Sequence, residues 1–294
     1  MRLYELARVS PTHNVKYYSH TMTFFDNFKS YQLIAAHRGY RSKRPENTLS
    51  AFRASIGHCH FIELDIQMSK DHVPVVIHDP SLARTSNAKA RCHQFNLQSL
   101  NVSDWTLLQL KALDVGTWFL DTDPFAAIHN KEVDPDELIQ ELPQTIMTLE
   151  EVLLHPGLHK IPVNIEIKDH KGREQNDKVP EAVIEVVKRT HSTNRVLISS
   201  FNHDYLVIVK TLAPMISTAA LVAGSHPDDL VGYLQSLDVA AYHPADDICD
   251  AELIRRLRAA GIGVNVYTVN SKERQKALFA MGATAVFTDY PELS

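Results

Sequence analysis

The sequence predicts an α/β fold, a TIM-type (β/α)8 barrel, from three observations. Apolar runs typical of strands recur along the 294 residues, and helix-like segments separate most of them, as in βα units with a parallel sheet. Eight such runs match the strand number of a closed barrel. No glycine-rich dinucleotide-binding motif follows any run, which makes an open doubly wound sheet the less favoured alternative.

The expected strands are short runs rich in aliphatic residues: 33–36, 61–68, 163–167, 196–199, 217–222, 237–241, 262–266 and 284–287. Helices are expected where apolar residues recur at helical spacing or a turn-forming motif precedes the segment: 48–57, 177–189, 204–212, 250–260 and 271–281. Gly261 and Gly282 follow the last two, where glycine commonly ends a helix. These segments together account for the barrel.

One interval between the second and third barrel strands is too long for a βα loop, which usually has roughly two to six residues. Residues 80–148 have mixed periodicity, both tryptophans and an acidic stretch near 134–141. We interpret them as a small insertion after the second strand, over the C-terminal rim where substrate would enter. Residues 1–30 lack a repeating pattern and are interpreted as an N-terminal extension, which leaves 31–294 as the barrel domain.

Composition and charge exclude several classes of function. The net charge of −5 provides no basic field for binding nucleic acid. No run approaches 18 apolar residues, so no membrane span is expected, although peripheral contact with lipid stays open. Three widely spaced cysteines argue against a disulfide framework, and the first residues lack the features of a signal peptide. We therefore expect a soluble cytoplasmic protein.

The most informative segment is 61–68, FIELDIQM, in which two carboxylates stand two residues apart. Alternate residues of a strand share a face, so Glu63 and Asp65 would lie together, opposite an apolar face. Two buried acids repel each other and lose hydration, and a divalent cation would relieve both effects, because hard cations prefer carboxylate oxygen. An ordinary half-exposed strand with both acids in water is an equal alternative for this segment alone.

Residues 163–168, VNIEIK, repeat this pattern and place Glu166 on the polar face with Lys168. In one parallel sheet Glu166 can approach Glu63 and Asp65, which predicts three oxygen ligands in an open site completed by water and substrate. Such ligands favour Mg²⁺ or Ca²⁺, with Mn²⁺ as a further option. Lys168 would add positive charge for an anionic substrate; a solvated Glu166–Lys168 pair is the alternative.

Two histidines fall where the chain reaches the same rim. His37 ends the first strand, and His78 follows a run, 75–77, that returns the chain to the C-terminal side, where barrels place catalytic groups. One histidine would take a proton from the nucleophile and the other would give one to the leaving oxygen. Arg38 is suited to bind a phosphate. The segment 58–60, HCH, precedes the second strand and is therefore interpreted as structural.

These segments, in this order, resemble the glycerophosphodiester phosphodiesterase family. The resemblance covers roughly residue 33 to the C-terminus and rests on the following segments: His37-Arg38-Gly39, Pro45-Glu46-Asn47-Thr48, Glu63-Leu64-Asp65, 75–79 with Leu82, Arg84 and Thr85, 164–168, Ser199-Ser200-Phe201, 266–270 and Thr288-Asp289-Tyr290-Pro291. It implies a TIM barrel with a small insertion after the second strand. It also implies hydrolysis of a glycerophosphodiester to sn-glycerol 3-phosphate and an alcohol such as choline or ethanolamine.

The resemblance implies a role for each matching side chain. It implies that the metal ligands are Glu63, Asp65 and Glu166, that the acid–base pair is His37 and His78, and that the phosphate contacts are Arg38 and Lys168. Glu46, after the first strand, would orient His37 or contact the substrate. Tyr267 stands where the family commonly has a tryptophan that lines the pocket, so the preferred headgroup would differ. His72 replaces the usual glycine of a turn, where we expect a small local rearrangement.

Two other functions stay open at this point. The same barrel would serve a lysophospholipase D-like hydrolase if its mouth were large and apolar. A non-catalytic barrel would bind a phosphorylated ligand or partner without turning it over, an option that the presence of both histidines and all three carboxylates disfavours.

Overall fold

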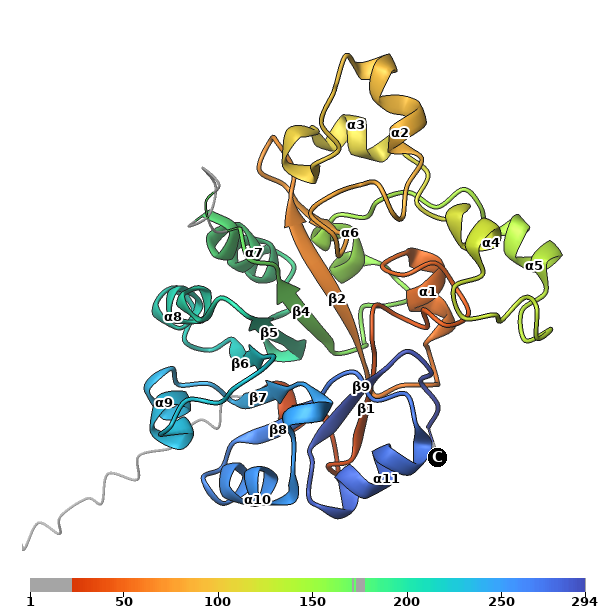
Figure 1. The fold of residues 1–294 in the computed structure, drawn as a ribbon. Coiled ribbons are helices and arrows are strands. Elements are labelled where there is room, and N and C mark those ends of the chain that lie inside the picture. The colour runs from red at the N-terminus through yellow and green to blue at the C-terminus, as the bar shows by residue number, and fades with distance from the viewer. Residues whose placement is uncertain (1–22, 171, 173–177, 294) are drawn as a thin grey trace, which may run out of the picture.

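Eight parallel strands close into a barrel with helices around it (Figure 1) in this computed structural model, which describes residues 23–170, 172 and 178–293. The barrel strands are β1 (Leu33–Ala36), β2 (Phe61–Met68), β4 (Val163–Ile167), β5 (Val196–Ser200), β6 (Ser217–Val222), β7 (Ala241–Pro244), β8 (Gly263–Val266) and β9 (Ala285–Thr288). β1 pairs with both β2 and β9, which closes the sheet. The predicted TIM barrel is confirmed, and a ninth strand, β3 (Pro74–Val76), pairs antiparallel with the end of β2.

One predicted strand, 237–241, is wrong, because the strand lies later, at β7. Residues Leu230–Ser236 form helix α9, which was not predicted, and Leu237 is its C-cap. Asp238 then adopts a positive φ of 51°. Leu237 and Val239 pack in the outer apolar cluster with Leu234. The apolar run therefore reflects the packing of a helix end and its loop. The other seven predicted strands have the observed bounds or differ by one residue at one or both ends.

The outer helices begin after polar cap residues wherever the cap lies in the described part of the chain. They are α1 (Leu49–Ala54), α6 (Leu149–Leu154), α7 (Lys178–Arg189), α8 (His203–Leu212), α9 (Leu230–Ser236), α10 (Ala251–Ala259) and α11 (Lys272–Ala280). The side chains of Thr48, Asp250 and Ser271 accept backbone N–H groups of the first turns of α1, α10 and α11. Gly261 and Gly282, beyond α10 and α11, have positive φ, as predicted. Residue 177, the expected start of α7, lies outside the described residues.

The chain between β3 and α6 forms short helices that extend beyond the end of β2 and beside α1 (Figure 1). They are α2 (Ala88–Arg91), η2 (Cys92–Phe95), η3 (Val102–Asp104), α3 (Leu107–Lys111), α4 (Trp118–Thr122) and α5 (Pro135–Gln140). Two small apolar clusters hold this segment, one around Trp105 and one around Phe119. The domain boundaries given above stay predictions, and residues 1–22 of the expected extension lie outside the described part of the chain.

Alternation along the strands separates an apolar outer layer from a barrel interior with two halves. Ile62, Leu64 and Ile66 pack outward, in a cluster that includes residues of α6 and α7. Inside the barrel, the half at the N-terminal ends of the strands holds small and aromatic side chains such as Ala35 and Phe61. The 3₁₀-helix η1 (Phe24–Asn27) covers this end, where the Phe24 ring meets Phe61 edge-on at 5.3 Å. The polar half of the interior therefore lies at the C-terminal ends of the strands.

Two further 3₁₀-helices, η4 (Thr193–Arg195) and η5 (Asp246–Ile248), precede β5 and α10. None of the described helices combines the length and the hydropathy that crossing a bilayer requires.

Candidate active site

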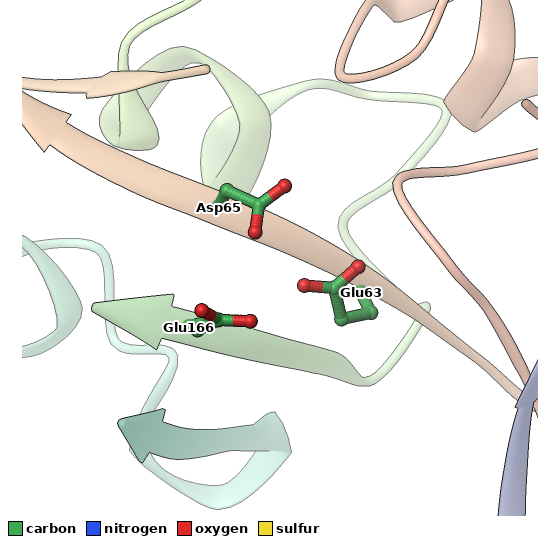
Figure 2. Close-up of side chains that lie close together, drawn as sticks. All are labelled: Glu63, Asp65 and Glu166. Carbon is green, nitrogen blue, oxygen red and sulfur yellow. The ribbon is translucent and has the colours of Figure 1, made fainter. Parts of the chain in front are cut away.

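Three carboxylates lie together inside the barrel. β2 and β4 pair in register, with Asp65 opposite Glu166 and Glu63 opposite Asn164. One oxygen from each of Glu63, Asp65 and Glu166 lies within 4.8 Å of the others, and Figure 2 shows the three side chains turned toward a common space. Their exposed fractions are 2%, 0% and 9%. The alternative of a half-exposed strand with its acids in water is therefore wrong.

Burial and mutual repulsion raise the pKa of Glu63 well above its usual range, because Asp65 and Glu166 are both negative and close. Its Oε2 accepts the backbone N–H of Arg38 at 2.8 Å. Its Oε1 is buried and accepts no hydrogen bond from the described residues. Burial likewise raises the pKa of Glu166. Glu63 therefore keeps one carboxylate oxygen without a partner, which is costly in a protein interior.

Lys168 lies between the other two acids. Its Nζ is 2.7 Å from Asp65 Oδ1 and forms an ion pair with Glu166. Burial alone would raise the pKa of Asp65, but the cations of Lys168 and Arg38 hold it well below its usual range. The solvated Glu166–Lys168 pair is therefore wrong as a description, because Lys168 is tied to two buried acids.

The donor set of this cluster fits a hard divalent cation. Three carboxylate oxygens from two neighbouring strands converge, and the unpartnered Oε1 of Glu63 is among the atoms that could bind. Oxygen ligands of this kind suit Mg²⁺, Ca²⁺ or Mn²⁺. Glu63, Asp65 and Glu166 are thus the described residues that could hold such an ion.

His37 directly follows β1 and is fixed by Asp289, which follows β9. Its Nδ1 is 2.7 Å from Asp289 Oδ1. Asn270 Nδ2 donates to the other oxygen of Asp289 at 2.8 Å. Burial lowers the pKa of His37, and the hydrogen bond to Asp289 opposes that change. Burial would raise the pKa of Asp289, but His37 and Arg41 lower it to about 2.

His78 has the same arrangement on the other side of the site. Its Nδ1 is 2.6 Å from Asp79 Oδ1, and its carbonyl accepts the side-chain amide of Gln67 at 2.9 Å. The hydrogen bond from His78 holds the pKa of Asp79 below its usual range despite partial burial. In each histidine Nδ1 is engaged by a carboxylate, while Nε2 has no partner among the described residues and is available to a substrate.

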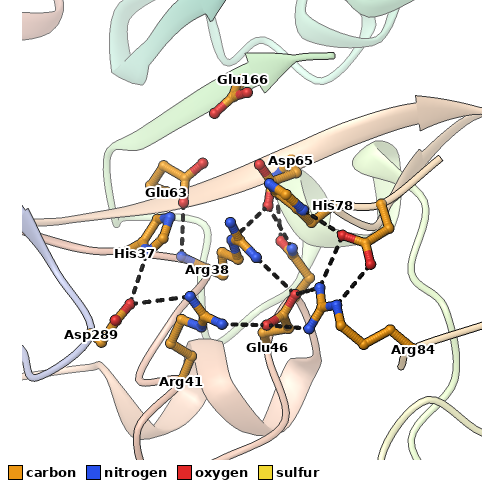
Figure 3. A network of polar contacts seen from close by, with 12 residues as sticks. His37, Arg38, Arg41, Glu46, Glu63, Asp65, His78, Arg84, Glu166 and Asp289 are labelled. Atoms are coloured by element: carbon orange, nitrogen blue, oxygen red, sulfur yellow. Dashed lines mark hydrogen bonds and ion pairs between the residues drawn. The ribbon is translucent and has the colours of Figure 1, made fainter. Parts of the chain in front are cut away.

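Glu46 lies in the loop before α1 and is surrounded by three arginines, as Figure 3 shows. Arg38 Nη1, Arg41 Nη2 and Arg84 Nη2 lie 3.0, 2.7 and 2.6 Å from its carboxylate oxygens. Burial would raise the pKa of Glu46, but the hydrogen bond from Arg84 and the charges of all three arginines lower it to about 2. Glu46 is therefore a buried carboxylate with both oxygens in use.

The loop that carries Arg38 has an unusual backbone. Arg38 has φ of 56° and Gly39 has φ of 79°, and a Cβ at Gly39 would lie 2.7 Å from the backbone of Ala51 in α1. The Arg38 guanidinium reaches Asp65 Oδ2 at 3.3 Å through Nε. Asn47 donates to the same oxygen at 2.7 Å. The short HRG segment thus places a cation beside the carboxylate cluster.

Tyr267 follows β8 and forms part of the pocket wall. Its hydroxyl donates to the carbonyl of Val222 at 2.9 Å, and its ring meets Phe201 at 6.0 Å, almost perpendicular. A small pocket lies beside it, lined by His37, Glu63, Asn164, Glu166, Ser199, Leu221, His243, Tyr267 and Phe287. The structure therefore brings Tyr267 to the same pocket as predicted acids and a predicted histidine.

The HCH segment at residues 58–60 and the turn at His72 do not form part of this site. His60, in the HCH segment, accepts the backbone N–H of Ile34 with Nδ1 at 2.9 Å, at the N-terminal end of β2, so it has a structural role as predicted. His72 adopts the left-handed conformation itself, with φ of 61°. The turn between β2 and β3 therefore forms without the usual glycine.

The sequence analysis assigned no functional role to Arg41, Asn47, Asp79 or Arg84, and named Asp289 only as part of the motif at residues 288–291. The available signals were weak: an aspartate directly after His78, and an asparagine directly after Glu46 in the loop before α1. These side chains come from three loops, which follow β1, β3 and β9, and they meet only in the folded chain.

Comparison with known proteins agrees with this geometry. The sequence model of the glycerophosphoryl diester phosphodiesterase family matches residues 37–293. A glycerophosphodiester phosphodiesterase of Bacillus altitudinis is 32% identical over 266 residues, covering 88% of this chain and 95% of that protein. One from Caldanaerobacter subterraneus is 32% identical over 263 residues, with the same two coverages.

Solved structures agree as well. An Oleispira antarctica phosphodiesterase, solved with the product sn-glycerol-3-phosphate, is 28% identical with a TM-score of 0.72, over 88% of this chain and 93% of that one. A structure from Silicibacter pomeroyi shares the fold, with a TM-score of 0.75 at 23% identity over 90% of this chain and 92% of that one. The chain therefore belongs to the glycerophosphoryl diester phosphodiesterase family and is a phosphoric diester hydrolase.

Proposed function

We propose that this chain hydrolyses a glycerophosphodiester to sn-glycerol 3-phosphate and an alcohol, with one divalent cation and two histidines as acid and base. The observation that carries the proposal is the convergence of three buried carboxylates with two aspartate-bound histidines at one end of the barrel. The solved relative from Oleispira antarctica, which contains sn-glycerol-3-phosphate, supports the choice of substrate class.

The charges of the site support a divalent cation. In the described residues, the network contains six carboxylates and four cationic side chains: Glu46, Glu63, Asp65, Asp79, Glu166 and Asp289, with Arg38, Arg41, Arg84 and Lys168. With all six carboxylates ionised, one histidine neutral as the base and the other protonated as the acid, one negative charge is in excess. A phosphodiester brings a further negative charge, and a divalent cation would offset the excess before substrate enters.

The side chains divide the reaction between them. A cation held by Glu63, Asp65 and Glu166 would supply charge neutralisation at a phosphate oxygen. Arg38 and Lys168 add positive charge beside it. One histidine takes a proton at Nε2 from the nucleophile, and the other donates one from Nε2 to the leaving alcohol oxygen.

The pocket favours a small polar substrate over a lysophospholipid. Most of the residues that line it are polar or titratable. A lysophospholipase D-like reaction would need an apolar mouth for an acyl chain. The alcohol arm would meet Tyr267, whose ring forms one wall.

Two finer features complete the proposal. We assign the cation as Mg²⁺ or Ca²⁺, because the ligand atoms are all carboxylate oxygens. We place the enzyme in the cytoplasm, because Cys59, Cys92 and Cys249 are free thiols, as expected in a reducing compartment.

The test is release of glycerol phosphate from glycerophosphocholine, measured with and without EDTA and with a panel of divalent ions. His37→Ala should lose activity, whereas His93→Ala, at an exposed position in η2, should keep it. Turnover that persists in EDTA would contradict the role of the metal. Full activity of His37→Ala would contradict the acid–base assignment.

A further inference from the structure

A continuous chain of ion pairs connects the two histidines through Glu46 (Figure 3). On the first side, His37 Nδ1 is bound to Asp289 Oδ1 at 2.7 Å. Arg41 spans from this aspartate to Glu46, with Nη1 3.4 Å from Asp289 Oδ1 and Nη2 2.7 Å from Glu46 Oε2. The aspartate that orients His37 is therefore tied to Glu46 by one guanidinium.

The second side mirrors the first. His78 Nδ1 is bound to Asp79 Oδ1 at 2.6 Å. Arg84 grips that aspartate with Nε at 2.7 Å and Nη2 at 3.1 Å. It grips Glu46 with Nη2 at 2.6 Å and Nη1 at 3.1 Å. Such paired contacts fix the plane of a guanidinium as well as its position.

We infer that Glu46 is a positioning residue that holds both histidine–aspartate pairs in place, and does not contact the substrate. The inference rests on the function proposed above. Both oxygens of Glu46 are engaged by arginines, and its exposed fraction is 5%. A contact with substrate would require breaking ion pairs in a buried site, which is unfavourable. One buried carboxylate thus sets the orientation of the base and of the acid together.

Electrostatics explains why the carboxylate is required. Three guanidiniums, those of Arg38, Arg41 and Arg84, converge on Glu46. Without the negative charge between them, three like charges would lie close together in a partly buried site and would separate. Arg41 and Arg84 would then move relative to Asp289 and Asp79. Each histidine would lose the fixed partner of its Nδ1, which sets its tautomer and its ring orientation.

The experiment replaces Glu46 by glutamine, which keeps the shape and removes the charge. We expect kcat on glycerophosphocholine to fall about tenfold or more, with KM changed less than about threefold, because orientation and not substrate binding is lost. We also expect the imidazole NMR signals of both His37 and His78 to shift. The matched control is Glu141→Gln, which removes a carboxylate that pairs with Arg44 and lies outside the network. It should change neither the kinetic constants nor the histidine signals.

One-sided variants keep the inference testable if Glu46→Gln folds poorly. Arg41→Lys should shift the signal of His37 alone, and Arg84→Lys that of His78 alone, because lysine cannot bridge two carboxylates with a planar fork. A rise in KM with unchanged kcat in Glu46→Gln would overturn the inference in favour of a substrate contact. Unchanged histidine signals would overturn it as well. The NMR result does not depend on turnover, so a wild-type protein inactive on glycerophosphodiesters would refute the proposed function separately.

Discussion

Replacing Asp289 by asparagine should weaken catalysis through His37 while leaving the barrel intact. Asp289 Oδ1 binds His37 Nδ1 at 2.7 Å, and its Oδ2 accepts Asn270 Nδ2 at 2.8 Å. Both partners approach with nitrogen, so an asparagine amide would place its own NH₂ against one donor. The substitution therefore removes either the charge-assisted bond to the histidine or the anchor of the residue that makes it.

The size of the effect follows from these contacts. A hydrogen bond to a charged group contributes about 1.5–3 kcal/mol, which corresponds to a roughly 10- to 150-fold decrease in kcat/KM. The pKa of Asp289, about 2, is below the usual value of 3.8. The aspartate thus stabilises the folded state by about 2 kcal/mol at neutral pH. That contribution is present above pH 4 and is lost as the pH falls through 2, and the asparagine variant should lack it.

The pH profile gives the sharpest readout. The hydrogen bond that His37 donates to Asp289 raises the pKa of His37, against the lowering by burial. Its loss should lower that pKa further, so the acid limb of kcat/KM should move to lower pH if neutral His37 acts as the base. The assay is glycerol phosphate release from pH 5 to 9. Asp238→Asn is the control, because Asp238 is an exposed acid paired with Lys210. An unchanged profile, or an acid limb at higher pH, would refute the reasoning.

Three further predictions concern the metal ligands, the pocket wall and the core. Glu63→Gln removes one of three buried acids, so the thermal unfolding midpoint measured in EDTA should rise. The further rise of this midpoint on adding Mg²⁺ or Ca²⁺ should disappear, because a metal ligand is lost. A wild-type response to metal would contradict this. Tyr267→Phe should cost about 1 kcal/mol in urea unfolding, because the bond to the Val222 carbonyl is lost, with substrate preference retained if only the ring contacts the alcohol. Ile165→Ala, buried on β4, should cost about 2–5 kcal/mol, against less than about 0.5 for exposed Ile139→Ala.

Much of the barrel could be predicted because its signals are local. β2 and β4 are apolar on the outer face and carry polar residues on the inner face, so their bounds follow from this local alternation. The error at 237–241 shows the limit of that approach. A helix end packed on a sheet, such as the α9 C-cap Leu237, has the same apolar composition as a short strand, and only its packing partners distinguish the two.

The site divides in the same way. Glu63, Asp65 and Glu166 could be identified because strand periodicity determines the face on which a side chain lies, and parallel strands align their ends. Arg41, Arg84 and Asp289 come from loops, where no period constrains the side-chain direction. Their ion pairs join segments that lie up to 252 residues apart in sequence, and single-sequence patterns carry no information on such contacts.

The contrast between the two halves of the barrel explains why the polar network is so extensive. The half of the interior at the N-terminal ends of the strands is filled with apolar side chains and covered by Phe24. The charged side chains of the other half therefore lie next to a region of low dielectric constant. A buried charge without a partner is strongly unfavourable. Each carboxylate therefore pairs with a cation, and each cation pairs with a second carboxylate. This chain of ion pairs ends at Arg84, whose side chain is exposed. Glu63 departs from this rule: among the described residues its Oε2 accepts only a backbone N–H, and its Oε1 accepts no hydrogen bond. A folded chain that retains such an atom is less stable than it could be, and a bound cation would supply the missing partner.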